Sequence, residues 1–249
     1  MNYIQEAFAW LADPSHWSGT GGIWVRLGQH LATTAIAVGI AVVIAVPIGI
    51  LVGHTRRGST AVAGIAGAAR AVPTLGLLTL FALWLGIGLE APLLALIILA
   101  IPSALAGAYA GIQAVDPAIP DSARAMGMNE GRIIAQVEIP LGAPVIIGGI
   151  RAAVLQVVAT ATLAAYVADN GLGRYLFIGL KTRDYAQMVA GAILVIVLAV
   201  ILEVVLALVQ RLVSTHVTHP ESQRGIVLLE AGYPAASHSV LLPQAGSHR

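Results

Sequence analysis

Residues 116–140, DPAIPDSARAMGMNEGRIIAQVEIP, form a polar segment between long apolar runs and contain six charged residues. Asp116 precedes Pro117, an order typical of a helix start, because the carboxylate accepts from free N–H groups and proline has no N–H to leave unpaired. Gly127 stands where a helix can end in a left-handed conformation, and Asn129 can cap the next helix. The segment, called the polar loop below, therefore predicts two short helices that meet at Gly127.

The rest of the 249-residue chain is apolar, with 58% hydrophobic residues, 10% charged residues and a mean hydropathy of +0.87. Soluble domains carry about 25% charged residues, which their surfaces need. This composition predicts an all-α membrane protein. The net charge of +1 and the lack of a basic run give no indication of a nucleic-acid partner. The absence of cysteine excludes disulfides and thiolate metal sites.

Five apolar runs are each long enough to cross a bilayer as a helix. They are residues 31–53, 59–88, 91–115, 143–168 and 185–213. We expect a kink in the second span at Pro73, whose ring removes one helical hydrogen bond. Gly107 and Gly111, four residues apart in the third span, predict close packing against a neighbouring helix.

The two ends of the chain differ from the central membrane domain, residues 31–213. Residues 1–30 contain three tryptophans typical of a membrane interface and predict an extracytoplasmic or interfacial segment, in which the first 11 residues form a surface helix or are disordered. The first basic residue is Arg26, so no basic signal-peptide region precedes the spans. Residues 214–249 are polar and predict a mobile cytoplasmic tail.

The distribution of basic residues predicts the orientation in a bacterial inner or plasma membrane. Cytoplasmic loops carry an excess of lysine and arginine. The turn after the first span, the polar loop and the end of the last span carry Arg56, Arg57, Arg124, Arg132 and Arg211. This places the polar loop in the cytoplasm. Three basic residues in the segment before the last span oppose this orientation: Arg174, Lys181 and Arg183.

The polar loop resembles the EAA loop of binding-protein-dependent ABC importer permeases. That family pattern is Glu-Ala-Ala, three residues, Gly, nine residues, Ile, one residue and Leu-Pro. The matching residues here are Asp121, Ser122, Ala123, Gly127, Val137, Ile139 and Pro140. The departures are Asp for Glu, Ser for Ala, Val for Ile and Ile for Leu. The surrounding sequence is most similar to permeases for glycine betaine, carnitine and choline, and the resemblance covers residues 31–213.

The resemblance implies a MetI-like permease fold with five core transmembrane helices. It also implies a separate ABC ATPase that binds ATP and Mg, an extracytoplasmic binding protein, and a second permease that is a copy or a homologue. The chain itself would be no enzyme, bind no cofactor or metal, and sit in the lipid bilayer as a multi-pass protein. The residues that would couple to the ATPase are Asp121, Ser122, Ala123, Arg124, Gly127, Asn129, Glu130, Arg132, Val137, Ile139 and Pro140. Arg124, Glu130 and Arg132 would form the rim of that contact.

Arg151 and Glu203 are ionisable residues inside apolar spans, where an isolated charge costs several kcal/mol. One hypothesis is that they pair or face a water-filled pathway. The alternative is that each side chain reaches back to the membrane interface.

Other candidate sites are weaker. Residues 53–60, GHTRRGST, resemble a phosphate-binding loop, but Ser59 stands where the lysine is needed, so nucleotide binding is excluded. Ser103 and Tyr109 are candidates to line a pathway shaped by prolines, with ordinary helix packing as the alternative. Ser103 is not expected to be a nucleophile, because the spans supply no histidine base.

The predicted function is the permease subunit of an importer for glycine betaine, choline, carnitine or proline betaine. Few aromatic residues, 5%, are present to cage a quaternary ammonium, so we expect the binding protein to supply most of the affinity. The alternatives are a permease for methionine or another amino acid, a stand-alone secondary carrier or an intramembrane hydrolase. Secondary carriers often contain internal repeats, and this sequence shows none, which argues against the carrier.

Overall fold

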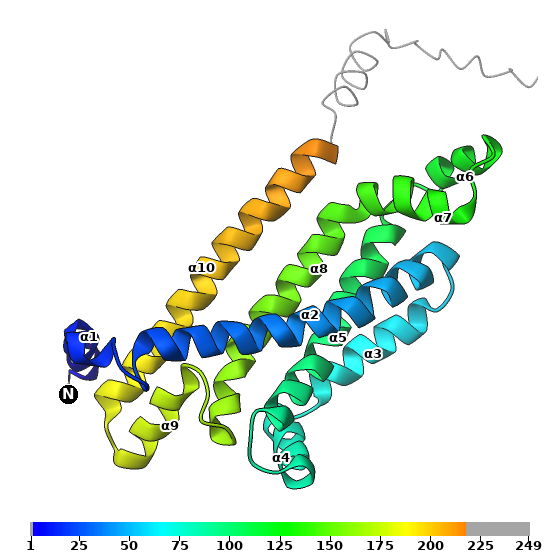
Figure 1. Ribbon diagram of the computed structural model, residues 1–249. Helices are drawn as coiled ribbons and strands as arrows, with labels where there is room; N and C mark the ends of the chain where they lie inside the picture. The colour runs from blue at the N-terminus through cyan, green and yellow to red at the C-terminus, as the bar shows by residue number, and fades with distance from the viewer. Residues whose placement is uncertain (1, 218–249) are drawn as a thin grey trace, which may run out of the picture.

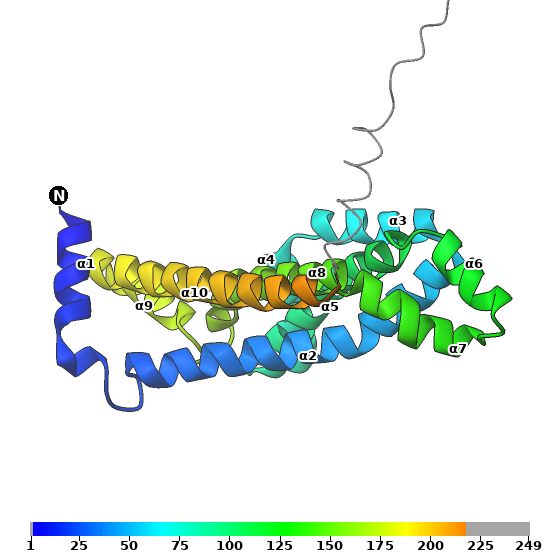
Figure 2. The same ribbon diagram turned by 90° about the horizontal axis from the view of Figure 1, so that it is seen from above.

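The structure, a computed structural model, describes residues 2–217, and within that range it is helical without strands. The α-helices are α1 (Tyr3–Ala12), α2 (Ile23–Thr55), α3 (Ser59–Ala71), α4 (Thr74–Leu85), α5 (Glu90–Gln113), α6 (Ala118–Ala125), α7 (Glu130–Ile133), α8 (Ile139–Thr160), α9 (Gly173–Thr182) and α10 (Tyr185–Val217). Two 3-10 helices, η1 (Pro14–His16) and η3 (Ala161–Tyr166), and a π-helix, η2 (Ile134–Glu138), complete the fold. Figures 1 and 2 show α6 and α7 at one end, the loop end, and α1 with α9 at the other, the outer end.

Four helical segments among the described residues are long and apolar enough to cross a membrane. They are Ile23–Thr55, Glu90–Gln113, Glu130–Tyr166 and Tyr185–Thr215. They correspond to four of the five predicted spans, two of which were predicted to end two residues further on, and they confirm the prediction of an all-α membrane protein. The chain also crosses the bundle in alternating directions, because α5 leads into the polar loop and α8 leads back from it (Figure 1).

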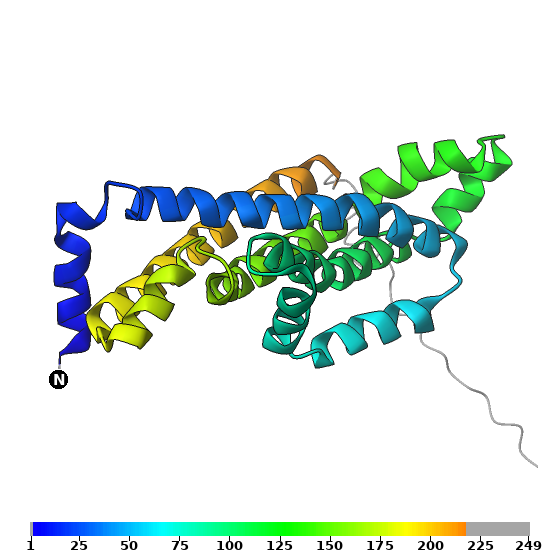
Figure 3. The ribbon, with the colours of Figure 1, turned by 60° about the horizontal axis from the view of Figure 1, so that its bottom comes forward.

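The second predicted span, residues 59–88, is not one kinked helix. Val72 has an extended backbone, with φ −71° and ψ 121°, so the helix ends before it and a new one starts at Thr74. A residue before proline avoids the helical conformation because the proline ring would clash with it, which is why Pro73 interrupts the helix completely. Figure 3 shows α4 leaving the end of α3 at a steep angle. Each piece is shorter than a bilayer needs.

The first span begins at Ile23, eight residues before the predicted start at residue 31. Two polar residues before position 31 are buried in the bundle: Arg26 is 8% exposed and His30 is 1% exposed. Arg26 lies 2.9 Å from the carboxylate of Asp169, and a ring nitrogen of His30 lies 3.0 Å from the carbonyl of Val158. Val158 lies in α8 and Asp169 follows it, so no local pattern around α2 indicates these partners.

The segment between the fourth and fifth spans contains α9, which the sequence analysis left without structure. Arg174 at its start lies 3.0 Å from Asp169, so Asp169 faces two arginines at the outer end. Part of the basic charge that opposed the predicted orientation is therefore neutralised within the protein.

The N-terminal helix α1 crosses the outer end of the bundle and contacts α9 and α10 through aromatic rings. Trp10 stacks on His16 and meets Tyr175 edge-on, and Tyr3 lies beside Tyr185. Figure 2 shows α1 running across the direction of α2. Of the two predictions for the first 11 residues, the helix is the one found. The predicted tail lies mostly outside the described residues, since α10 continues to Val217.

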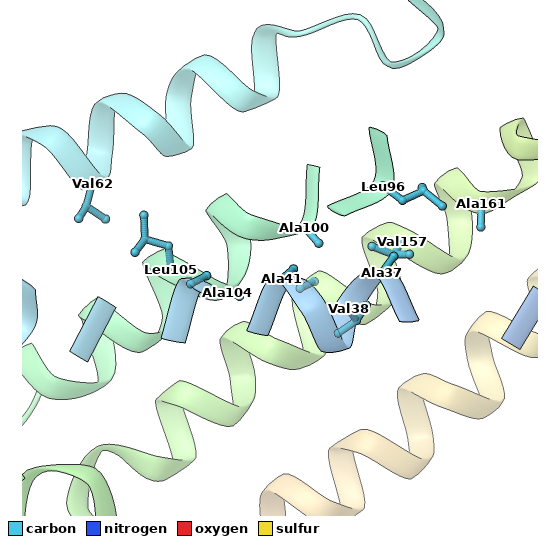
Figure 4. Packing of buried hydrophobic residues seen from close by; sticks show 12 residues of the cluster. Ala37, Val38, Ala41, Val62, Leu96, Ala100, Ala104, Leu105, Val157 and Ala161 are labelled. Carbon is cyan, nitrogen blue, oxygen red and sulfur yellow. The ribbon is translucent and has the colours of Figure 1, made fainter. Parts of the chain in front are cut away.

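Small side chains from α2, α5 and α8 form the centre of the bundle. The fully buried residues include Ala37, Ala41 and Ala45 of α2, Ala100 and Ala104 of α5, and Val157 of α8. Figure 4 shows alanines of α2 facing those of α5, with Val157 beside them. Because alanine adds only one carbon, the backbones approach closely, which is how apolar helices gain contact energy when lipid removes the hydrophobic drive to associate.

Glycines bring α5 into backbone contact with both neighbours. A methyl group on Gly107 would lie 2.3 Å from the Cα of Gly149 in α8, and one on Gly111 would lie 2.8 Å from the carbonyl oxygen of Gly142. On the other side, a methyl group on Gly49 of α2 would lie 2.7 Å from the carbonyl oxygen of Leu105. The predicted close packing at Gly107 and Gly111 is confirmed.

Replacing Gly107 by Ala should destabilise the bundle by about 1–3 kcal/mol, because the added methyl group meets backbone that cannot rotate away. Thermal unfolding of the purified chain in detergent measures this. Gly39→Ala in α2 is the matched control, since a methyl group there has open space and improves helix propensity. Equal melting temperatures for the two variants would show that the α5–α8 contact is not tight.

Candidate functional site

The polar loop is a rigid turn whose ends are held by its own residues. The Asp116 carboxylate accepts from the N–H of Ala118 at 2.9 Å, as a helix cap does. At the other end of α6, the N–H groups of Gly127 and Met128 donate to the carbonyls of Arg124 and Ala123. This pattern needs a left-handed residue, and Gly127 supplies it with φ +85°.

Asn129 begins the second helix of the loop. Its side-chain oxygen accepts from the N–H of Arg132 at 2.9 Å and caps α7. The prediction of two short helices meeting at Gly127 is therefore confirmed, as α6 and α7.

The surface of α6 has an outward face and an inward one. Ala123 is 3% exposed and packs inside its own chain, while Ser122 is exposed and donates to the carbonyl of Ala118. Ile119 and Met126 are 44% and 77% exposed. Because residues 119, 122 and 126 share one helical face, they form a small, partly apolar outward surface at the end of the molecule.

Arg124 links the two helices of the polar loop. It contacts the carboxylate of Asp121 at 2.6 Å within α6 and that of Glu130 in α7 at 2.8 Å. The hydrogen bonds to Glu130, followed by those to Asp121, raise the pKa of Arg124 above its usual value. Arg124 and Glu130, expected as separate rim charges, are thus partners of each other, and Arg132 is exposed.

His54, at the end of α2, joins this cluster from the membrane bundle. One ring nitrogen lies 2.7 Å from a carboxylate oxygen of Glu138, and the other lies 3.1 Å from Glu130. Glu138 is buried, with 4% exposure. The wide turn of the π-helix η2 makes this position possible, because it stacks Glu138 above buried Ile133, five residues earlier. In an α-helix two such residues point about 140° apart.

The other motif residues lie where α7 passes into α8. Val137 and Ile139 are partly buried, and Pro140 is exposed at the first turn of α8. Since Pro140 has no N–H to donate, the helix loses one regular bond next to the π-turn.

The structure places Arg151 of α8 and Glu203 of α10 in contact. Arg151 Nε donates to Glu203 Oε2 at 2.9 Å, and a second guanidinium nitrogen contacts Glu203 Oε1. Arg151 also donates to Gln210, which donates to the carbonyl of Pro144 at 2.9 Å. The side chains therefore engage each other instead of extending separately to an interface, and they tie α10 to α8.

The proposed pathway residues are mostly engaged in packing. Ser103 donates to Gln156 at 2.7 Å, and Tyr109 packs against the alanine core. Pro102 is buried within α5, which continues through it.

Sequence reasoning missed two residues of the cluster. His54 lies in the turn after the first span, for which only Arg56 and Arg57 were considered, and Glu138 is the single unconstrained residue between Val137 and Ile139 of the motif. A glutamate between two apolar motif residues was the available signal. Within residues 2–217, no group of three acidic or histidine side chains is arranged to hold a metal ion.

The chain matches, over residues 45–218, the family described as the binding-protein-dependent transport system inner membrane component. The chain belongs to this family. It is therefore the membrane subunit of an ABC importer, in which ATP hydrolysis resides in a separate subunit. The matched range contains the whole polar loop and all helices from α5 to α10.

Sequence relatives include osmolyte permeases from three bacteria. The glycine betaine/carnitine/choline transport system permease protein OpuCB of Bacillus subtilis is 34% identical and covers 72% of this chain and 82% of its own length. The carnitine transport permease protein OpuCB of Listeria monocytogenes is 36% identical, covering 70% and 80%. The osmoprotectant import permease protein OsmW of Salmonella typhimurium is 32% identical, covering 68% and 81%.

Solved structures share the fold. A chain of the MetNI methionine ABC transporter in an inward-facing conformation superposes with a TM-score of 0.67 at 21% identity, covering 81% of this permease and 99% of that chain. A chain of an amino acid ABC transporter with histidines has a TM-score of 0.60 at 22% identity, covering 76% and 92%. The MetI-like fold expected from the sequence is confirmed.

Reversing either charge of the Arg151–Glu203 pair should destabilise the permease by about 2 kcal/mol, since the remaining charge loses its partner. The double variant Arg151→Glu with Glu203→Arg should recover most of that loss. Thermal unfolding in detergent measures both. Arg211→Glu, an exposed reversal on α10, is the control expected to change little. A double variant no more stable than the worse single one would contradict direct pairing.

Proposed function

We propose that this permease imports small quaternary ammonium osmoprotectants such as glycine betaine, choline, carnitine or proline betaine. The observation that carries the proposal is the set of osmolyte permeases at 32–36% identity over about 70% of the chain. The solved neighbours that transport methionine or amino acids are only 21–22% identical, so they support the fold and leave amino-acid import as the second candidate.

The permease would act with several partners. A separate ATPase would bind ATP and Mg, a binding protein would deliver the solute at the outer end, and a second permease, a copy or a homologue, would complete the pathway. Alternating access would follow from rigid-body motion of the bundle driven through the polar loop.

Two features of the polar loop support its docking to the ATPase. It is braced from within by two helix caps and the Arg124 ion pairs, so a displacement moves it as a unit. Its outward surface, Ile119, Ser122 and Met126, is partly apolar and small, which suits insertion into a groove of a partner.

The distribution of aromatic rings supports weak solute binding by the permease itself. Tyr166 and Phe177 pair beside a cavity of about 230 Å³, but Arg174 and Lys181 also line it. Two cations there repel a quaternary ammonium group. The other ring contacts among the described residues lie at the outer end, between α1, η1 and the starts of α2, α9 and α10. The affinity would then reside in the aromatic cage of a binding protein.

Transport by proteoliposomes tests the substrate. The permease is reconstituted with its ATPase and binding protein, and uptake of labelled betaine, choline and methionine is compared with and without ATP. ATP-dependent uptake of betaine or choline, without methionine uptake, is the expected result. Methionine uptake alone would replace the proposal by its second candidate, and uptake without ATP would contradict coupling altogether.

Replacing Gly127 by Val should release the ATPase from the complex, because a branched side chain at φ +85° costs about 2 kcal/mol or more and distorts the end of α6. Co-purification of the ATPase with tagged permease measures this. Gly127→Asn is the matched control, since asparagine tolerates the left-handed conformation. If the Val variant retains as much ATPase as the Asn variant, the loop geometry does not govern docking.

Replacing Met126 by Asp should also weaken ATPase binding, by placing a charge on the outward surface without touching the fold of the loop. Co-purification of the ATPase measures this too. The control is Thr60→Asp, an exposed position in α3 at the loop end. Equal retention of the ATPase by both variants would show that this surface is not the contact.

A further inference from the structure

The strongest polar contact between the membrane bundle and the polar loop is made by His54. Its side chain is 11% exposed and lies between Glu138, 5% exposed, and Glu130, 55% exposed. Both ring nitrogens are within hydrogen-bonding distance of carboxylate oxygens. Carboxylate oxygens accept hydrogen bonds and imidazole nitrogens can form them, so the ring bridges the two acidic side chains. The bridge gives the buried Glu138 a polar partner.

This contact joins elements that the chain does not join directly. The polar loop is continuous with α5 and α8, but α2 reaches it only through space. His54 contacts α7 through Glu130 and η2 through Glu138. Glu130 also forms an ion pair with Arg124 of α6. Among residues 2–217, the ion pairs between α2 and the polar loop all involve His54.

Packing does not replace this link at the loop end. Between the end of α2 and the loop lies a cavity of about 180 Å³, lined by His54, Thr55, Arg56, Pro117, Pro120, Asp121, Arg124 and Glu138. Apolar side chains do not fill the gap, so the bridge by His54 spans it. Further along, α2 is packed tightly on α5, where a methyl group on Gly53 would lie 2.7 Å from Ile112. Motion given to α2 at this point is therefore shared with the core.

We propose that His54 is a positioning residue for energy coupling: its ring, held by Glu138 and Glu130, makes the end of α2 follow the polar loop when the ATPase displaces it. The inference rests on the proposed docking of the loop to an ATPase, and it adds a direct route by which that motion enters the first helix. Without the bridge, the loop still docks, but its motion reaches α2 only through the packing of α2 on α5.

The transport test compares wild type with His54→Gln, which has one donor nitrogen in place of the two ring nitrogens that form the bridge. In proteoliposomes with ATPase and binding protein, betaine taken up per ATP hydrolysed should fall on the order of five-fold or more in the variant, while the ATPase remains bound. Arg57→Gln removes a nearby exposed cation with no bridging role and should behave as wild type. A variant with the wild-type ratio would overturn the proposal.

A second measurement is independent of the transported solute. Because the chain contains no cysteine, spin labels can be attached at Leu51→Cys on α2 and Gln136→Cys on η2, both exposed positions. In the complex with the ATPase, the label distance should stay narrow on adding ATP in wild type and become broad with His54→Gln. Equal distributions would overturn the inference. Failure of the proposed substrate would instead appear as absent betaine uptake by wild type, with the label distances still responding to His54.

Discussion

Backbone contact between α5 and its two neighbours is the constraint on which the rest of the structure depends. Glycines and alanines remove the side-chain layer between helices, so α2, α5 and α8 touch almost directly. Lipid offers no hydrophobic drive for helices to associate, and dense contact takes its place. A core packed this closely cannot deform gradually, so the three helices respond to a displacement as one body. A loop attached to α5 and α8 at one end can therefore move groups far from it.

The charged residues are arranged around that core in a way that follows from the cost of burying them. Charges that lie against the bundle are paired: Asp169 faces Arg26 at the outer end, and Glu203 faces Arg151 beside α10. At the loop end His54 plays the same part for Glu138. The apolar centre stays free of ionic groups, while the pairs connect helices whose packing alone is loose, such as α10.

Features that depend on neighbouring residues could be predicted from the sequence, whereas features that depend on long-range contacts mostly could not. Asp116, Gly127 and Asn129 predict the two helices of the polar loop, because helix caps and left-handed turns depend on neighbouring residues. Gly107 and Gly111 announce close packing in the same way. The start of the first helix was placed too late, because the partners of Arg26 and His30 lie after α8 and within it. Pro73 was read as a kink because the sequence does not show whether the helix resumes in the same direction. His54 and Glu138 meet only in the folded chain, and a π-turn decides where Glu138 points.

The break between α3 and α4 has a consequence for how this chain is solvated. α3 has 13 residues, so at 1.5 Å per residue the break lies about 19 Å from its start, a depth comparable to the middle of a hydrocarbon layer. The last carbonyls of a helix lack donors, and hydrocarbon supplies none. Val72 at the break is 40% exposed in the single chain. This side of the permease is thus wetted or covered by protein in the assembly, while the unbroken helix α10 can face lipid along its length.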